Sequence, residues 1–240
     1  MKLAIDIGNT FIKCAVFNKN KIIYRLSIQE PIELLQTIKK HIPSHIIISS
    51  VVPSQSKKFI NFLQKHIDSQ IETVDYKKTN LKLRVPNPSS IGNDRICNVF
   101  AAIKLYSPPL IVVDFGTATT YDVVNSKNEF IGGIIAPGVE TSSANLISKA
   151  ALLNNIKFEF PSKVVGNNTA TNIQSGIMFG AVSQVEGLIK KIETERKVQF
   201  NVLLTGGFAK LLSPHLCIKH ILDIDLTLKG MFYIYEDINK

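Results

Sequence analysis

Apolar and polar residues alternate along the first third of the chain in blocks that predict strands and then helices. Short apolar runs separated by polar turns predict a three-stranded meander at residues 2–6, 11–17 and 22–28. Apolar residues at helical spacing then alternate with apolar runs of strand length. We expect helices at residues 31–42 and 54–66, and strands at residues 46–52 and 71–74. A meander followed by alternating helices and strands is typical of an α/β domain.

The same plan begins again after Pro108 and Pro109. A second meander is predicted at residues 110–113, 121–124 and 130–135. It is followed by predicted helices at residues 144–153 and about 169–195, a strand at residues 200–204 and a closing helix after Leu226. In each meander the first strand leads into an Asp-x-Gly turn, with Asp114 in the place of Asp6. The repeat predicts two related α/β lobes, residues 1–107 and 108–240, with a ligand cleft between them.

The two Asp-x-Gly turns are the first candidates for chemistry. One such turn can simply end a strand, but two copies in matching positions favour a shared binding function. We expect phosphate oxygens to be bound by amides and hydroxyls of small turn residues: Gly8, Asn9, Thr10, Gly116, Thr117, Ala118 and Thr119. Asp6 and Asp114 would provide oxygen for cations that neutralise phosphate charge, directly or through water. Lys13, on the returning strand, could reach a phosphate as a point charge.

Composition narrows the classes of function. The 240 residues include 28 Lys and Arg against 19 Asp and Glu, but the positive charge is mostly Lys and no basic run exceeds a pair. A solvated Lys-rich surface is therefore favoured over a nucleic-acid interface. Neither GxxxxGK[ST] nor GxGxxG occurs, which argues against a P-loop and a Rossmann site.

Cysteine usage and apolar runs bear on the compartment. Cys14, Cys97 and Cys217 are odd in number and far apart, so they predict neither a disulfide framework nor a zinc site. A reducing cytoplasm fits this pattern best. The early Asp6 interrupts the N-terminal apolar run, and no stretch approaches the length of a membrane span. We expect neither a signal peptide nor a membrane-spanning segment.

Two further motifs have both a structural and a functional interpretation. Gly206 and Gly207 follow an apolar strand, where they would let an adenine or ribose lie against the backbone, although a plain strand-to-helix turn explains them equally well. Asp94 precedes an apolar helical pattern, so it can either stabilise the positive end of a helix or act as a base. Arg95 beside it offers a partner for a carboxylate.

These motifs together resemble the acetate and sugar kinase, heat-shock ATPase and actin superfamily, and within it the type III pantothenate kinase family. The resemblance covers nearly the whole chain. It rests on the ordered set of residues 6–13, the GxDR-like residues 92–95, residues 114–120, residues 132–138 and residues 205–207. It implies two ribonuclease-H-like lobes, the duplication found in actin-like ATPases, with a nucleotide in the cleft between the lobes.

The implied activity is transfer of the ATP γ-phosphoryl group to the primary hydroxyl of pantothenate, which gives 4'-phosphopantothenate in the first step of coenzyme A biosynthesis. By this resemblance Asp94 is the proton acceptor, and pantothenate is held by Gly92, Asn93, Asp94, Arg95 and Thr169. ATP is held by Asp6, Gly8, Asn9, Thr10, Lys13, Thr117, Gly206 and Gly207. Asp114 holds a monovalent cation, potassium or ammonium, and magnesium accompanies ATP near Asp6, directly or through water. The family also implies a homodimer.

One departure and two alternatives qualify the resemblance. Family members commonly carry Tyr in a Tyr-x-Asn-Pro sequence before GxDR, whereas Val85 precedes Pro86-Asn87-Pro88 here, so a substrate contact from that phenol is absent or comes from elsewhere. A phosphatase of the same superfamily would release phosphate without pantothenate. A non-catalytic, nucleotide-gated regulator would bind ATP alone, which calorimetric titration with ATP and pantothenate distinguishes from a two-substrate site.

Overall fold

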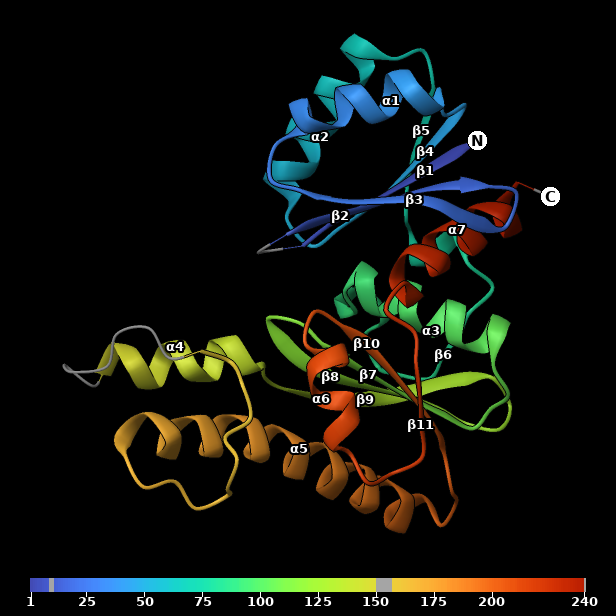
Figure 1. The fold of residues 1–240 in the computed structure, drawn as a ribbon. Coiled ribbons are helices and arrows are strands. Elements are labelled where there is room, and N and C mark those ends of the chain that lie inside the picture. Colours follow the sequence, from blue (N-terminus) through green and yellow to red (C-terminus); the bar gives the residue numbers. More distant parts are fainter. Residues whose placement is uncertain (9–10, 150–156, 240) are drawn as a thin grey trace. The chain divides into compact units, whose positions relative to one another are not determined.

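The computed structural model describes residues 1–8, 11–149 and 157–239, which form two compact units (Figure 1). Unit 1 contains Met1–Tyr106, Glu129–Ile131 and Asp225–Lys240, and unit 2 contains Ser107–Asn128 and Gly132–Ile224. The change of unit after Tyr106 lies next to the boundary expected from the sequence. The C-terminal helix, however, belongs to unit 1 and not to a lobe spanning residues 108–240, because it packs on elements of the first half of the chain.

Unit 1 is built on a five-stranded sheet with the order β3-β2-β1-β4-β5. Its strands are β1 (Lys2–Ile7), β2 (Ile12–Asn18), β3 (Lys21–Ile28), β4 (His45–Ser50) and β5 (Gln70–Thr73). The first three pair antiparallel, which confirms the predicted meander, and β4 and β5 add in parallel on the other side of β1. The central strand β1 therefore lies between a hairpin and a parallel strand.

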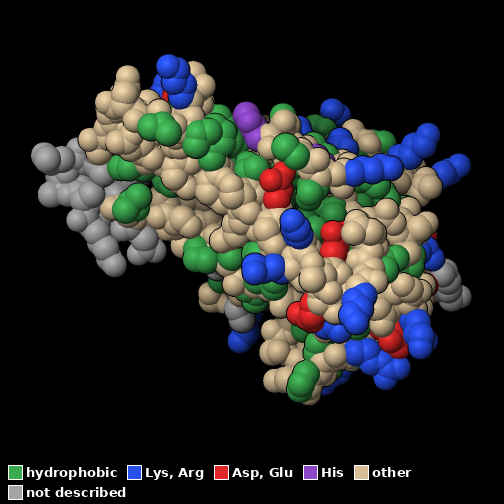
Figure 2. All heavy atoms as spheres, turned by 90° about the horizontal axis from the view of Figure 1, so that it is seen from below, with side chains coloured by type: hydrophobic (Ala, Val, Ile, Leu, Met, Phe, Trp, Pro, Cys, Tyr) green, Lys and Arg blue, Asp and Glu red, His purple; other side chains and the backbone are tan. Residues whose placement is uncertain are grey.

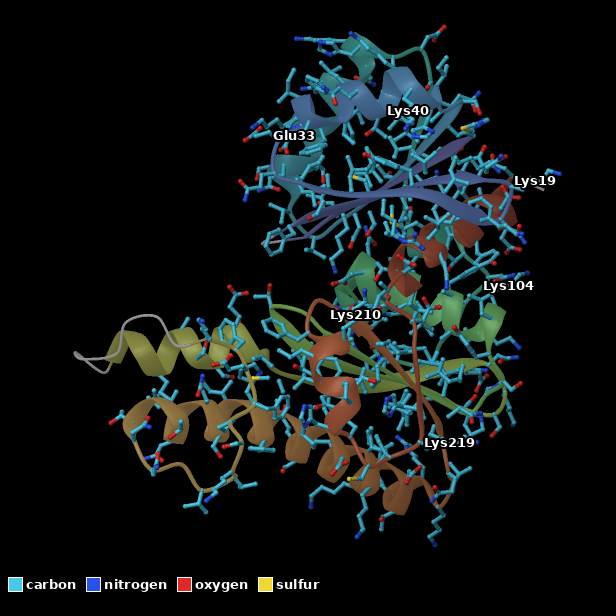
Figure 3. All side chains as sticks on the ribbon, viewed as in Figure 1. Lys19, Glu33, Lys40, Lys104, Lys210 and Lys219 are labelled. Atoms are coloured by element: carbon cyan, nitrogen blue, oxygen red, sulfur yellow. The ribbon has the colours of Figure 1, made fainter. Side chains whose placement is uncertain are left out.

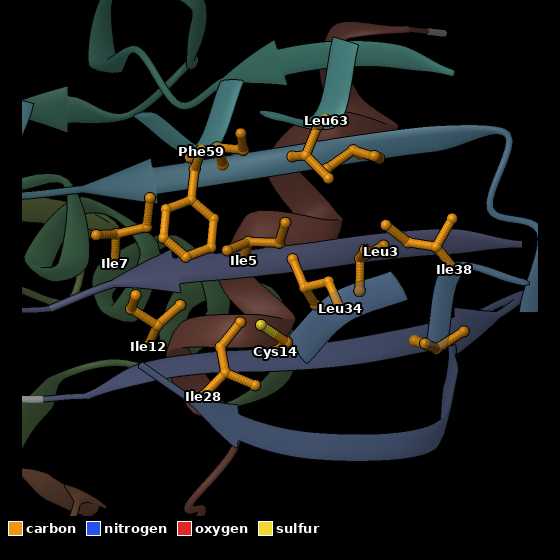
Figure 4. Packing of buried hydrophobic residues seen from close by; sticks show 13 residues of the cluster. Leu3, Ile5, Ile7, Ile12, Cys14, Ile28, Leu34, Ile38, Phe59 and Leu63 are labelled. Carbon is orange, nitrogen blue, oxygen red and sulfur yellow. The ribbon is translucent and has the colours of Figure 1, made fainter. Parts of the chain in front are cut away.

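Helices cover both faces of this sheet. The 3₁₀ helix η1 (Pro31–Leu34), α1 (Leu35–His41) and α2 (Pro53–His66) lie on one face, and α3 (Asn93–Leu105) and α7 (Leu226–Ile238) on the other. Figure 4 shows Leu3 and Ile5 of β1 packed with Leu34, Phe59 and Leu63 on the first face. Alternation along β1 turns Ala4 to the second face. One strand thus contributes to two hydrophobic cores.

The helices α3 and α7 are packed closely. A Cβ atom at Gly230 of α7 would overlap the backbone of Cys97 in α3, so only glycine fits at this crossing. The Thr227 hydroxyl donates to the Asn98 side-chain oxygen at 2.8 Å, and the Phe17 and Phe232 rings stack with centroids 4.6 Å apart. These contacts attach the end of the chain to α3 and β2.

The second sheet repeats this plan. Its order is β11-β10-β7-β8-β9-β6. The strands are β6 (Lys82–Leu83), β7 (Leu110–Phe115), β8 (Ala118–Val124), β9 (Glu129–Pro137), β10 (Asn201–Gly206) and β11 (His220–Leu222). The predicted second meander is confirmed as β7-β8-β9, and β10 lies parallel to the central β7 as β4 lies parallel to β1. The two-residue strand β6 pairs with Glu129 and Phe130, and these residues belong to unit 1.

Unit 2 also contains α4 (Val139–Lys149), the long α5 (Thr169–Arg196), the short α6 (Ala209–Leu212) and the 3₁₀ helix η4 (Ser213–His215). α5 begins as predicted, because the Asn168 side chain accepts from the Thr171 amide at 3.0 Å in a capping box. α4 begins at Val139, five residues before the helix expected at residues 144–153. Residues 150–153 of that expected helix lie outside the described residues.

The surface agrees with the expectation of dispersed charge. On the face shown in Figure 2, Lys and Arg side chains are interspersed with acidic and hydrophobic ones.

Within the described part of the chain, no helix combines the length and apolar character that a bilayer crossing requires.

Candidate functional site

The first acidic turn ends β1 in unit 1. Asp6 pairs with Lys13 on β2 and with Ser49 on β4. Side chains of directly paired residues share a face of the sheet. Because Ala4 of the same strand faces α3 and α7, the side chains of Asp6, Lys13 and Ser49 belong to that face as well.

Asp94 lies at the start of α3 on this face of unit 1. Gly92 is the N-cap residue, and Asp94 Oδ1 accepts a hydrogen bond from the Arg95 amide at 2.8 Å. A carboxylate in the first turn of a helix is stabilised by the positive end of the helix dipole. A Cβ atom at Gly92 would lie 2.5 Å from Asp94 Oδ1, so the carboxylate occupies space that only a glycine leaves open.

Cys97 lies one helical turn after Asp94, and its thiol is near the carboxylates of both Asp6 and Asp94. Its side chain is fully buried, and burial raises the pKa of the thiol well above its ordinary value. The negative charges of Asp6 and Asp94 raise this pKa further, so both carboxylates lie near the same thiol. The structure therefore brings the first acidic turn and the candidate proton acceptor to one region of unit 1. Sequence reasoning did not place Cys97 near the candidate site, because a buried helical cysteine carries no motif.

Arg95 is also held at the start of α3. Its guanidinium carbon lies 5.7 Å from the centroid of the Phe130 ring, a cation–π arrangement within unit 1. The Asn93 side chain donates to the Val74 carbonyl at 3.2 Å. Of the substrate residues expected from the sequence, residues 92–95 thus lie together, and Thr169 is the exposed first residue of α5 in unit 2.

The second acidic turn ends β7 in unit 2. Asp114 pairs with Thr120 on β8 and with Thr205 on β10, so the three side chains share a face of the second sheet. Gly206 follows with φ of +97°, and a Cβ atom there would lie 2.5 and 2.6 Å from the backbone N and O of Phe115 and overlap the Asp114 carboxylate. The end of β10 therefore approaches the acidic turn so closely that glycine is required.

The loop after Asp114 is fixed by the start of α4. The carbonyl oxygen of Thr117 accepts from the Gly138 amide at 3.0 Å and from the Thr141 hydroxyl at 2.6 Å. A Cβ atom at Gly138 would overlap the Gly116 carbonyl, so this contact also depends on glycine. Gly207 comes next to Gly206, in the turn that leads into α6.

Several expected phosphate donors are engaged elsewhere or are outside the described residues. The Gly8 amide donates to the Phe11 carbonyl at 3.2 Å, and the Gly116 amide donates to the Ala118 carbonyl at 3.1 Å, so both bonds close their own hairpins. Thr119 is buried and pairs with Phe115, which puts its side chain on the opposite face from Asp114. The Thr119 hydroxyl therefore does not lie beside Asp114, and its expected role as a phosphate donor stays a prediction. Asn9 and Thr10 lie outside the described residues.

Sequence reasoning gave no role to three hydroxyl residues beside the carboxylates: Ser49, Thr120 and Thr205. Each hydroxyl oxygen is buried and makes no hydrogen bond of ordinary geometry to any residue that the structure describes. Hydroxyl residues close to the end of otherwise apolar strands were the available signal.

Among the described residues, no group of three or more His, Cys, Asp or Glu could hold a metal ion. A cation bound at Asp6 or Asp114 would therefore depend on hydroxyl, carbonyl, water or phosphate oxygens, which suit magnesium and potassium.

The two repeated mixed sheets, each with an acidic turn on its central strand, form an α/β two-lobe fold that matches the structures of actin-like ATPases. The activator of 2-hydroxyisocaproyl-CoA dehydratase from Clostridium difficile, solved with bound ADPNP, has a similar structure, with a TM-score of 0.59 and 13% identity over 99% of this chain and 95% of that one. ROK hexokinase from Thermus thermophilus has a TM-score of 0.53 and 11% identity over 98% and 99% of the two chains. These likenesses establish the fold, which confirms the predicted α/β architecture with two related lobes.

The family follows from sequence comparison. The family model described as type III pantothenate kinase matches residues 2–191. The type III pantothenate kinase of Sulfurihydrogenibium sp. (strain YO3AOP1) is 47% identical over 191 residues, which are 79% of this chain and 75% of that protein. The chain belongs to the type III pantothenate kinase family, ATP-dependent enzymes that phosphorylate pantothenate in coenzyme A biosynthesis. The resemblance given by the sequence motifs is confirmed.

Proposed function

We propose that this enzyme transfers the γ-phosphoryl group of ATP to the primary hydroxyl of pantothenate with Asp94 as the proton acceptor. The observation that supports this most is that Asp6 ends β1 on the sheet face covered by α3, and that Asp94 lies in the first turn of that helix, both within unit 1. The pantothenate hydroxyl oxygen forms a bond to the γ-phosphorus, the bond from that phosphorus to the bridging oxygen breaks, and ADP leaves. The hydroxyl proton passes to the Asp94 carboxylate.

Pantothenate would be held by the residues around the start of α3. We assign Arg95 to the pantothenate carboxylate, because a guanidinium forms strong, oriented hydrogen bonds to a carboxylate. The cation–π contact with Phe130 limits the positions that this guanidinium can take, which supports the assignment. Gly92 and Asn93 would shape the pocket for the reacting hydroxyl, and Thr169 is proposed as a further pantothenate-binding residue.

The residues proposed to bind ATP are Asp6, Gly8, Asn9, Thr10, Lys13, Thr117, Gly206 and Gly207. Magnesium would accompany ATP near Asp6, directly or through water, and Asp114 would hold potassium or ammonium. The buried hydroxyl oxygens of Thr120 and Thr205 beside Asp114 fit such a cation, because hard cations bind oxygen donors. A bound cation supplies charge neutralisation for the phosphates, on which a loose phosphoryl-transfer transition state depends.

Replacing Asp94 by Asn tests the catalytic assignment. We expect the variant to keep its affinity for MgATP and to lose turnover by about 100-fold or more, as is common when a general base is removed. The assay is formation of phosphopantothenate from ATP, magnesium and pantothenate, with potassium present and then withheld. Asp68→Asn, the same change at an exposed acid of unit 1, is the matched control and should keep wild-type turnover.

Two results would contradict the proposal. Wild-type turnover in purified Asp94→Asn would remove Asp94 from the mechanism. Phosphate release at the same rate without pantothenate would show that water, and not the alcohol, is the acceptor.

We also propose that the enzyme is a homodimer. Unit 2 leaves several large apolar side chains exposed: Ile135 at 64%, Leu146 at 48%, Val164 at 63% and Val165 at 84%. The family resemblance implies a homodimer, and a partner would cover apolar side chains of this kind if they form a contiguous patch. Light scattering on the chromatographed protein should give twice the mass of 26.6 kDa, and a monomer at micromolar concentration would contradict this.

The cytoplasmic location expected from the sequence stays a prediction, to be tested by cell fractionation.

A further inference from the structure

Three buried hydroxyl groups have no hydrogen-bond partner of ordinary geometry among the described residues. They belong to Ser49, Thr120 and Thr205. Ser49 and Thr205 are 0% and 1% exposed, so water does not reach these side chains from bulk solvent. A buried hydroxyl without a partner is unfavourable, since folding removes the bonds to water that it makes in the unfolded chain. A ligand that restores a hydrogen bond or a coordination bond would recover this loss.

Each of these hydroxyls lies beside one of the two acidic turns. Thr120 and Thr205 flank Asp114 from the neighbouring strands β8 and β10. Ser49 flanks Asp6 from β4, where its oxygen also lies near the Cys97 thiol. β4 has the same position relative to β1 that β10 has relative to β7. A buried hydroxyl beside an acidic turn is therefore present at equivalent positions in the two sheets.

We propose that Thr120 and Thr205 are positioning residues for the cation that binds at Asp114. In the nucleotide-bound enzyme their hydroxyl oxygens bind the cation or its water molecules and fix the direction of the Asp114 carboxylate. This inference rests on the proposed function and adds ligands that the resemblance does not name.

The chemistry of the hydroxyl group supports this role. A hydroxyl offers one proton to a carboxylate or a water and two lone pairs to a cation, so it can serve any of these partners. Threonine on a strand has few rotamers, which keeps its oxygen in place. Valine has nearly the same shape as threonine and lacks both functions. An exchange of Thr for Val therefore removes the hydroxyl and leaves the packing largely intact.

The test compares Thr205→Val and Thr120→Val with Thr205→Ser and Thr120→Ser in the full chain. We would measure the melting temperature without ligand in tetramethylammonium chloride, the potassium concentration for half-maximal activation, and calorimetric binding of a non-hydrolysable ATP analogue with magnesium. Each valine variant should need about 10-fold more potassium, the effect of losing one hydrogen bond or ligand. The serine variants should return to within about 2-fold of the wild type.

The melting temperature separates this role from a structural one. Without ligand, both valine variants should melt at the wild-type temperature or a few degrees above it, because an unpartnered buried hydroxyl is removed. Thr227→Val is the matched control, since the Thr227 hydroxyl donates to Asn98 at 2.8 Å. That variant should melt several degrees lower and keep its potassium dependence.

Unchanged potassium activation and analogue binding in both valine variants would overturn the inference. A fall in melting temperature as large as that of Thr227→Val would also overturn it, because the hydroxyl would then have a structural partner. If the wild type binds the analogue but the variants bind it equally well, only this inference fails. If the wild type binds neither nucleotide nor pantothenate, the proposed function fails first.

Discussion

Gly92→Ala is the substitution that most directly tests whether the orientation of Asp94 matters. The new methyl carbon would lie 2.5 Å from Asp94 Oδ1, whereas real Cβ atoms essentially never approach closer than 3.0 Å. The carboxylate must therefore move by about 0.5 Å or more. Its hydrogen bond from the Arg95 amide, 2.8 Å long, would lengthen or break with this movement. The perturbation changes the position of the proposed base without removing it.

The expected effect on stability is small. The backbone at Gly92 has φ of −60° and ψ of 145°, which alanine adopts without strain. Alanine is a poorer N-cap residue than glycine, at a loss of up to about 1 kcal/mol, but it also reduces the entropy of the unfolded chain by about 0.4 to 1 kcal/mol. These effects nearly cancel. We expect the melting temperature to change by less than about 4 °C.

The expected effect on catalysis is much larger. Misplacement of a reacting group by 1 Å can lower the rate about 100-fold, so a shift of half that size should reduce kcat by roughly 10-fold or more. The KM for ATP should stay near the wild-type value, because ATP is assigned to other residues. Steady-state kinetics with coupled detection of ADP measures both constants, and circular dichroism checks that the variant is folded.

Gly187→Ala in α5 provides the control. A Cβ atom there meets nothing within 4 Å, so the variant should gain stability from the higher helix propensity of alanine and keep its kcat. A folded Gly92→Ala enzyme with wild-type kcat would refute the reasoning. It would show either that Asp94 does not act at the reacting hydroxyl or that its position is not critical.

Three further predictions follow from particular side chains and backbone angles. Gly206→Ala should lower the melting temperature by several degrees or prevent folding, because φ of +97° and the nearby Phe115 backbone both exclude a side chain; a wild-type melting curve would contradict this. Of the three free cysteines, only the exposed Cys217 should react with a thiol reagent in the native protein, since burial shields the other two and raises their pKa values; labelling of two thiols before unfolding would contradict this. The backbone amides of residues 30 and 29 donate to the side chain of Glu33, which is labelled in Figure 3, and lower the pKa of its carboxyl below the ordinary 4.5. The ionised carboxylate therefore stabilises the folded state above pH 4.5, and this stabilisation is lost as the pH falls through the lowered pKa. Melting curves from pH 6 to pH 3 should therefore fall more steeply for the wild type than for Glu33→Gln, and parallel curves would contradict this.

Local patterns were sufficient to predict most of the elements. Alternating apolar residues and Asn-rich or Asp-x-Gly turns depend on neighbours in sequence, so both meanders could be predicted from the chain alone. The two-residue strand β6 could not, because it is too short to show a period and forms only through its pairing with Glu129 and Phe130. The early start of α4 could not be predicted either, because it comes directly after the contact of Gly138 with the second acidic turn, and a contact between distant residues leaves no periodic pattern in the sequence.

Features of the site that depend on long-range contacts escaped prediction. The Asp-x-Gly motif identified Asp6 and Asp114, but it could not show that the Gly8 and Gly116 amides close their own hairpins. Whether a hydroxyl such as that of Thr205 has a partner is decided by strands distant in sequence. The assignment of α7 to unit 1 depends on the close approach of Gly230 to Cys97, which are more than a hundred positions apart.

The region after residue 191 lies beyond the match to the family model, yet the structure makes it part of the same fold. β10 pairs with β7 along six residues and brings Thr205 and Gly206 to Asp114. Without β10, the central strand β7 would be left with an unpaired edge, and Asp114 would lose two of its neighbours. α7 likewise closes the second hydrophobic core of unit 1 with Met231, Phe232 and Ile234. The match therefore ends inside the fold: the segment that follows it pairs with the strand of Asp114 and completes a hydrophobic core of unit 1.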